Sequence, residues 1–136
     1  MKKLVFALLA LLVLSGCAAP SQGGQTAQAE GGYRQVSMEE AIAMMESESD
    51  YVIVDVRTPE EFRERHIPGA VNVPNESIHT QDIPQLPDKD QLILVYCRSG
   101  NRSKQASQKL AELGYTRIVE FGGINDWPGE IVTGEE

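Results

Sequence analysis

One short segment carries the residue types that could do covalent chemistry, Cys-Arg-Ser-Gly-Asn-Arg-Ser at positions 97–103. It follows the apolar run LILVY and precedes a helical pattern, so Cys97 stands where a strand meets a helix. The first N–H groups of a helix lack partners within it and attract anions. A cysteine in such a place, beside arginines, can have its pKa lowered from about 8.5 to about 3.5–7.5. We predict that Cys97 is a nucleophilic thiolate above an anion-binding loop made of Arg98, Ser99, Gly100, Asn101, Arg102 and Ser103.

The charge pattern supports an anion site at this loop. The chain has 12 Lys and Arg against 20 Asp and Glu, a formal net charge of −8. Residues 91–111 contain no acidic residue but four basic ones, Arg98, Arg102, Lys104 and Lys109. Local positive charge on an acidic protein favours a small anionic ligand, whereas the overall balance argues against nucleic acid as a partner. Lys104 and Lys109 are equally well explained as solvated charges on a helix face.

Several further candidates lie outside the loop. Asp55 and Arg57 follow an apolar run, and Asp55 could either accept N–H bonds from a loop or pair with Arg57; we favour a structural role. His66 and His79 have no second His or Cys nearby in sequence, so no metal site is predicted. We expect His66 to lie in a turn and Trp127 to pack in the core.

The N-terminus is typical of an export signal. Two lysines precede eleven apolar residues, 4–14, which suit a signal peptide but are too few for the ~20 residues of a spanning helix. The Leu-Ser-Gly-Cys that follows resembles the lipid attachment motif of bacterial lipoproteins. We predict cleavage after residue 16, lipidation of Cys17, and an extracytoplasmic position on a bacterial membrane, at the cell surface or on the periplasmic side. The alternative is an ordinary secretory leader cut near Ala19.

The predicted cleavage changes how the cysteines and the charge are interpreted. The chain has two cysteines, so lipidation of Cys17 leaves Cys97 as a free thiol. Loss of both N-terminal lysines moves the net charge from −8 to −10. Positions 20–32, PSQGGQTAQAEGG, form a flexible tether that spans about 20 Å. The predicted segments are a signal peptide at 1–16, lipidated Cys17 with its tether at 17–32, and one folded domain at 33–136.

Strands and helices alternate within the predicted domain. Such alternation indicates an α/β fold with a mostly parallel central sheet. Ser-Met-Glu-Glu at 37–40 and Thr-Pro-Glu-Glu at 58–61 have the pattern of helix capping boxes. The expected strands are 34–36, 51–56, 70–73, 91–96 and 117–121; the expected helices begin at 37 and 58, run from 103 to about 113, and include short ones near 82–86 and 127.

Two stretches resemble the rhodanese family. They are VDVRTPEEFRERHIPGAVNVP at 54–74 and VYCRSGNRS at 95–103, the latter followed by KLAELGY and VEFGGINDW. The resemblance spans residues 36–127 and implies a parallel sheet of about five strands flanked by helices. It also implies a catalytic Cys97 that alternates between thiolate and persulfide, with no metal or organic cofactor. The backbone amides of the loop would hold the outer sulfur or an anionic donor.

The resemblance bears on individual residues as well. Arg102 stands where a basic residue commonly aids substrate binding, and Asp55 with Arg57 matches the family's Asp-Val-Arg element. Two features depart from the family pattern. Arg65 replaces a frequent glycine before His66, and the segment after Trp127 is short, which leaves the C-terminal wall of the site undetermined.

The leading functional hypothesis is a sulfurtransferase that moves a sulfane sulfur from thiosulfate or a similar donor to cyanide or a thiol. Its partners would be a small anionic donor and a thiophilic acceptor, with the membrane contacted only through the lipid, and we expect a monomer. One alternative is a cysteine-loop phosphatase or arsenate reductase. Another is a module that binds an anion or sulfur without catalysis. Cysteine phosphatases have Arg six positions after Cys; here Arg102 comes one position earlier and Ser103 is sixth.

Overall fold

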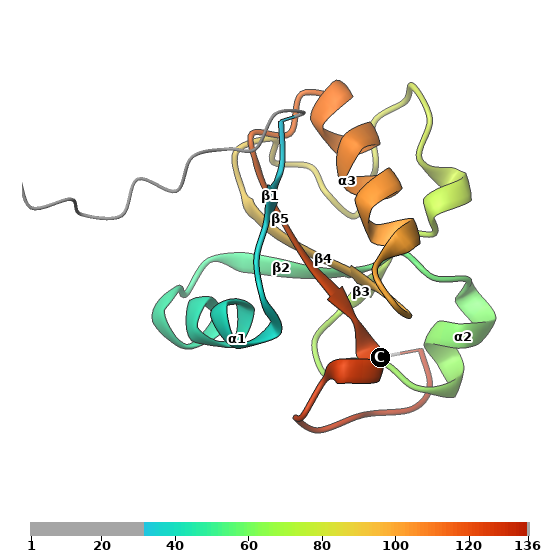
Figure 1. The fold of residues 1–136 in the computed structure, drawn as a ribbon. Helices are drawn as coiled ribbons and strands as arrows, with labels where there is room; N and C mark the ends of the chain where they lie inside the picture. The colour runs from blue at the N-terminus through green and yellow to red at the C-terminus, as the bar shows by residue number, and fades with distance from the viewer. Residues whose placement is uncertain (1–31, 136) are drawn as a thin grey trace, which may run out of the picture.

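The computed structural model describes residues 32–135, which form one five-stranded parallel sheet with helices on both faces (Figure 1). The predicted signal peptide, Cys17 and nearly all of the tether lie outside these residues. The strand order is β1-β5-β4-β2-β3, and every neighbouring pair is parallel. This confirms the predicted α/β fold. The strands are β1 Arg34–Gln35, β2 Tyr51–Asp55, β3 Val71–Asn72, β4 Leu92–Cys97 and β5 Arg117–Gly123; the helices are α1 Met38–Ser47, α2 Pro59–Glu64 and α3 Asn101–Glu112, with single 3₁₀ turns at Asn75–Ser77 and Ile124–Asp126.

Strand β4 forms the middle of the core and divides it into two layers. All six of its residues are buried, as expected for a strand covered on both faces of a parallel sheet. Leu94 and Tyr96 pack on the side of α1 and α2, while Val95 and Cys97 pack on the side of α3. The two layers are visible in Figure 1, where α3 and the segment after β3 lie opposite α1 and α2. Cys97 therefore faces the start of α3.

Both predicted capping boxes are present. Ser37 caps α1 and exchanges hydrogen bonds with Glu40, and Thr58 caps α2 in the same way with Glu61. Each box satisfies two N–H groups at the helix start. Pro59 occupies the first turn of α2, where its missing N–H costs nothing.

The sequence prediction was wrong about the segment between β3 and β4. The short helix lies at Asn75–Ser77, whereas residues 82–86 form only a turn closed by a hydrogen bond from Leu86 N–H to the Ile83 carbonyl. Ile83 and Leu86 are both buried in the α3-side core, and Pro84 lies between them. The burial of Ile83 and Leu86 therefore holds this segment in place without a helix. Among residues 32–135 no helix is long and apolar enough to cross a membrane.

Candidate active site

Cys97 is the last residue of β4 and lies at the carboxyl edge of the sheet, where ligands of parallel α/β sheets bind. Its thiol is buried, with 1% of the residue exposed. The register between β4 and β5 shifts between Val95 and Cys97, so that Cys97 pairs with Gly123. This irregularity turns the chain into the loop directly after the sulfur.

The loop between Cys97 and α3 is shorter than the sequence predicted. The helix begins at Asn101, and Ser103 does not cap it. Gly100 is the N-cap residue and has a φ of +109°, a left-handed conformation that L side chains rarely adopt. This glycine allows the helix to start three residues after Arg98. As a result Asn101 and Arg102 belong to the helix, and the side chain of Ser103 points into the site.

Hydrogen bonds converge on the Cys97 sulfur. The Gly100 N–H donates to Sγ at 3.0 Å, and the Ser103 Oγ lies 3.4 Å from Sγ. Burial disfavours the thiolate, but the Ser103 hydroxyl and the backbone N–H groups of Ser103, Gly100 and Ser99 outweigh it and lower the pKa of Cys97. The pKa of Cys97 is therefore shifted in the predicted direction. The largest contributions that lower it come from hydrogen bonds rather than from arginine charge.

A buried carboxylate, which the sequence did not reveal, lies behind this sulfur. Glu120 of β5 is 3% exposed, and its Oε1 lies 2.6 Å from the Ser103 Oγ and accepts the Gly122 N–H at 2.8 Å. Strand alternation puts Val119 and Phe121 in the core under α1 and turns Glu120 toward α3. Only that alternation could have indicated its position, because 17 residues separate it from Ser103.

Arg102 is held by a carboxylate of another helix. Its Nη1 and Nη2 donate to the two carboxylate oxygens of Glu61 in α2, at 2.7 Å and 3.0 Å. Hydrogen bonds from Arg102 lower the pKa of Glu61 to about 2 against partial burial, and Thr58 contributes further. The charge of Cys97 also raises the pKa of Arg102, although less than Glu61 does, so the guanidinium lies within electrostatic reach of the thiolate.

The outer part of the loop is exposed and close to the end of β5. Arg98, Ser99 and Asn101 are exposed, and the Arg98 carbonyl accepts the Asn125 N–H at 3.3 Å. A Cβ atom on Gly123 would lie 2.0 Å from that carbonyl oxygen, so only glycine fits there. The predicted loop residues are thus brought together: the side chains of Arg98, Ser99 and Asn101 are exposed, while the Ser103 hydroxyl and the Gly100 N–H lie at the sulfur.

Asp55 and Arg57 form a buried ion pair at the carboxyl end of β2. The Asp55 carboxylate accepts the Arg57 backbone N–H at 2.9 Å and its Nη2 at 2.6 Å. Arg57 Nη2 also donates to the Arg65 carbonyl at 2.7 Å. The pair therefore ties the end of β2 to the segment after α2, an arrangement that fits a structural role for both residues.

Most of the remaining sequence candidates have partners in the scaffold. His66 is buried, stacks on Phe62 at 3.8 Å, and pairs through its backbone with Val132. Trp127 packs against the α1-side core. Lys109 donates to the Asn75 carbonyl at 2.9 Å, while Lys104 is exposed. Within residues 32–135 no three His, Cys, Asp or Glu side chains are close enough to hold a metal ion.

The rhodanese-like domain family matches residues 37–130, which include Cys97, its loop and Glu120. This chain belongs to that family. Among curated proteins, it is 38% identical to the thiosulfate sulfurtransferase PspE of Escherichia coli over 73 residues, which cover 54% of this chain and 70% of that protein. It is 40% identical to a sulfurtransferase of Allochromatium vinosum over 79 residues, 57% of this chain and 72% of that protein.

A solved structure supports the same assignment. A rhodanese from E. coli, determined with anions, matches this rhodanese-like domain with a TM-score of 0.57 and 36% identity. The match covers 62% of this chain and 99% of the E. coli chain. Residues 1–18 separately match the prokaryotic membrane lipoprotein lipid attachment site, which supports membrane anchoring.

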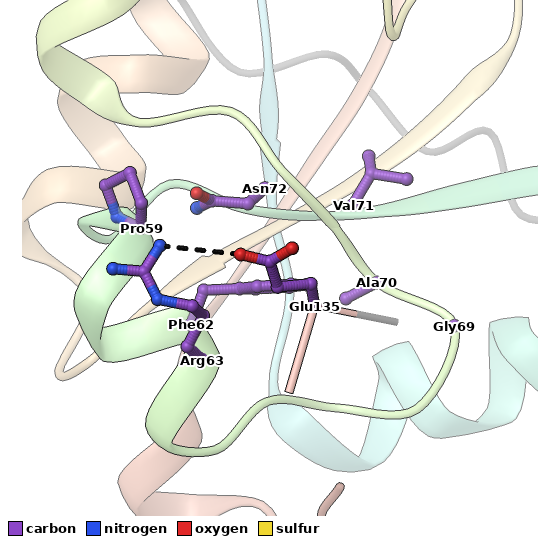
Figure 2. Close-up of a pocket in the computed structure, with 8 residues that line it drawn as sticks. All are labelled: Pro59, Phe62, Arg63, Gly69, Ala70, Val71, Asn72 and Glu135. Atoms are coloured by element: carbon purple, nitrogen blue, oxygen red, sulfur yellow. Dashed lines mark ion pairs between the residues drawn. The ribbon is translucent and has the colours of Figure 1, made fainter. Parts of the chain in front are cut away.

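The rhodanese-like domain also has a hollow of about 490 Å³ away from Cys97 (Figure 2). It lies between α2, β3 and the end of the described chain, where Arg63 and Glu135 approach to 3.9 Å across its mouth. Both of these side chains are half exposed or more, so this ion pair contributes little. No residue of the Cys97 loop lines the hollow, and the thiol chemistry is therefore separate from it. The lining residues are Pro59, Phe62, Arg63, Gly69, Ala70, Val71, Asn72 and Glu135.

Proposed function

We propose that this protein is a sulfurtransferase that carries a sulfane sulfur as a persulfide on Cys97. The observation that carries the proposal is the buried Cys97 thiol, whose pKa is lowered by hydrogen bonds from the loop. A thiolate is the nucleophilic form of cysteine, so no separate base is required at the moment of attack. The sulfurtransferases among its relatives support the same reaction class.

The proposed reaction has two displacement steps. The Cys97 thiolate attacks the outer sulfur of thiosulfate, a Cys97–sulfur bond forms, and sulfite leaves with the electrons of the broken sulfur–sulfur bond. Cyanide or a thiolate then attacks the outer sulfur of the persulfide, and Cys97 leaves again as a thiolate. Donor, persulfide and leaving group are all anionic, and N–H groups already oriented in the loop would stabilise each of them.

The loop geometry favours sulfur transfer over phosphate ester hydrolysis. Cysteine phosphatases use a free arginine to grip two phosphate oxygens in bidentate fashion. In this protein the two terminal nitrogens of Arg102 each donate a hydrogen bond to Glu61. A tetrahedral phosphate would have to displace this contact, whereas one additional sulfur atom on Cys97 would need only the amides of the loop.

The anchored location belongs to the same proposal. The N-terminal lipid attachment match supports a lipid on Cys17, and we infer that residues 17–32 tether the domain to the outer side of a bacterial membrane. Residues 33–136 would then act on small donors in that compartment.

The test is the intact mass of the purified protein before and after thiosulfate. We expect one added sulfur atom, its removal by cyanide with thiocyanate as product, and negligible hydrolysis of an aryl phosphate. Cys97→Ser should gain no sulfur and show no transfer above the uncatalysed reaction. Efficient phosphatase turnover without sulfur transfer would instead support the phosphatase alternative.

A further inference from the structure

Arg102 brings a positive charge to the Cys97 sulfur, and a carboxylate of another helix already holds that charge. Arg102 lies in the first turn of α3, next to Ser103, whose Oγ is 3.4 Å from Sγ, and its charge acts on Cys97 through space. Its Nη1 and Nη2 donate to the two carboxylate oxygens of Glu61 at 2.7 Å and 3.0 Å. A molecule that approaches the sulfur therefore meets a compensated ion pair at Arg102 and not a free cation.

Glu61 is itself fixed to the start of α2. Its Oε2 accepts the Thr58 backbone N–H at 3.0 Å and the Thr58 hydroxyl at 3.1 Å, within the capping box. The side chains of Arg102 and Glu61 are 27% and 25% exposed, so the pair is accessible from the site but largely covered. A guanidinium held in bidentate fashion by an anchored carboxylate has a defined position. Glu61 therefore determines where the charge of Arg102 lies and how much of it is compensated.

The charge that a ligand meets near Arg102 depends on both members of the pair. The pKa of Glu61 is lowered to about 2, chiefly by the hydrogen bonds from Arg102, so this carboxylate is ionised at neutral pH. Glu76, exposed on the turn after β3, adds a weaker negative charge toward Arg102. Arg98 and Lys104 are exposed, where salt and water screen their charges. Glu61 thus cancels most of the positive charge that Arg102 brings to the sulfur.

We propose that Glu61 is a specificity determinant that favours organic sulfane donors with one negative charge over the doubly charged thiosulfate. The inference rests on the proposed sulfurtransferase function. Because the energy between two charges scales with their product, a doubly charged donor loses more than a singly charged one when a carboxylate compensates the nearby cation. Glu61 acts on the donor through Arg102, so it is a positioning residue.

Methanethiosulfonate and thiosulfate form a matched pair of donors for this question. Each has a sulfane sulfur bonded to a tetrahedral sulfur, but a methyl group in methanethiosulfonate replaces one charged oxygen of thiosulfate. With either donor, the Cys97 thiolate bonds to the outer sulfur, the sulfur–sulfur bond breaks, and methanesulfinate or sulfite leaves with its electron pair. The comparison therefore changes the charge of the donor and keeps the bonds that form and break.

The test is kcat/KM of the full-length protein for each donor, with cyanide as the acceptor. We expect Glu61→Gln to raise the value for thiosulfate about fivefold more than the value for methanethiosulfonate, as for a unit charge near the protein surface. The difference should shrink at high salt, which a purely structural effect would not do. Glutamine retains the capping-box pattern of α2. Glu60→Gln, which removes an exposed carboxylate from the same helical turn, is the matched control and should leave the donor ratio unchanged.

Alkylation of Cys97 tests the same electrostatics without any sulfur transfer. Iodoacetate carries one negative charge and iodoacetamide none, and the ratio of their rates cancels any change in the thiolate fraction. Mass spectrometry of the Cys97 peptide reads the labelling, so Cys17 does not contribute. Glu61→Gln should raise the iodoacetate-to-iodoacetamide ratio at least about twofold, whereas Arg102→Gln, which leaves Glu61 uncompensated, should lower it.

The outcomes separate this inference from the proposed function. Equal donor ratios in Glu61→Gln and the wild-type protein would overturn the inference. An alkylation ratio that stays constant in Glu61→Gln or in Arg102→Gln would do the same, and Arg102→Gln decides the matter if Glu61→Gln fails to fold. Absence of sulfur transfer from both donors in the wild-type protein would overturn the proposed function, and the inference with it.

Discussion

At the residue scale, burial and hydrogen bonding compete at Cys97 and hydrogen bonding prevails. Each hydrogen bond to a charged group contributes about 1.5–3 kcal/mol, and one pKa unit corresponds to about 1.4 kcal/mol. Several donors of that size exceed the penalty of burying the sulfur, in agreement with the lowered pKa of Cys97. The Ser103 hydroxyl is the largest single favourable contribution and three backbone N–H groups add to it, so the fold of the loop is part of what lowers the pKa of Cys97.

Gly123→Ala tests this dependence on the backbone. The new Cβ would lie 2.0 Å from the Arg98 carbonyl oxygen and must push the loop away from β5. The N–H groups that face Sγ would move with it, so we expect the alkylation rate of Cys97 at neutral pH to fall at least about tenfold, the loss of about 1.4 kcal/mol.

Gly69→Ala is the control for a general loss of stability. Its φ is +80° but nothing lies within 4 Å of the added Cβ. It should lower the free energy of unfolding by about 1 kcal/mol and leave the alkylation rate unchanged. Equal alkylation rates in Gly123→Ala and the wild-type protein would contradict the proposed control of the sulfur by the loop.

The residues of the site differ in how far sequence could predict them. Cys97 and its loop are contiguous, so strand–helix patterning alone is enough to predict an anion-binding role for them. Glu120 and Glu61 reach the site across 17 and 41 residues of chain, and neither has a local pattern that distinguishes it from a surface glutamate. Both are placed by tertiary structure, Glu120 by the register of β5 and Glu61 by the position of α2 beside α3.

At the element scale, Glu61 joins two helix starts. In the first turn of α2 it accepts the Thr58 N–H, and across the site it binds Arg102 in the first turn of α3. One carboxylate thus completes a capping box and links the start of α2 to the start of α3.

This double role predicts an acid-dependent stability. The folded-state pKa of Glu61 is about 2, below its ordinary value of 4.5, so its contribution is complete above pH 4.5 and is lost as pH falls toward 2. We expect Glu61→Gln to lower the free energy of unfolding by about 1–2 kcal/mol at neutral pH, a modest value because both side chains are partly exposed. Urea unfolding should show this difference shrinking as the pH is lowered below 4.5.

Glu60→Gln provides the matched control. Glu60 is in the same helical turn and feels the same helix dipole, but it is exposed and lies outside the capping box. Its substitution should cost a few tenths of a kcal/mol. A pH-independent cost in Glu61→Gln would show that its carboxylate charge is not the source of the stabilisation.

Element boundaries show where local rules were sufficient. Ser37 and Thr58 precede helices that no other residue competes to cap, and the capping-box pattern identified both starts. At α3 the preference for serine at a helix start selected Ser103, whereas the left-handed Gly100 starts the helix three residues earlier. The hydroxyl that looked like a cap is used by Cys97 and Glu120 instead, and no local pattern separates these two uses of serine.

At the scale of the whole molecule, the lipid attachment site and the domain have separate tasks. The chain is acidic, with a net charge of −8, so electrostatics alone would repel it from an anionic membrane surface. The described residues contain no helix able to span a membrane. The lipid attachment match at residues 1–18 supports membrane anchoring through a lipid.

Cys17→Ser should abolish anchoring without affecting the site. Each buried CH₂ contributes about 0.8 kcal/mol, so a single acyl chain binds only marginally and two or three hold a protein stably. A serine accepts no thioether-linked lipid, and we expect the variant in the soluble fraction after membranes are sedimented. Its Cys97 should still gain one sulfur atom from thiosulfate. Cys97→Ser is the reciprocal control, because it should remain with the membranes and gain no sulfur. Membrane retention of Cys17→Ser equal to that of the wild-type protein would mean that something other than a lipid on Cys17 holds the chain there.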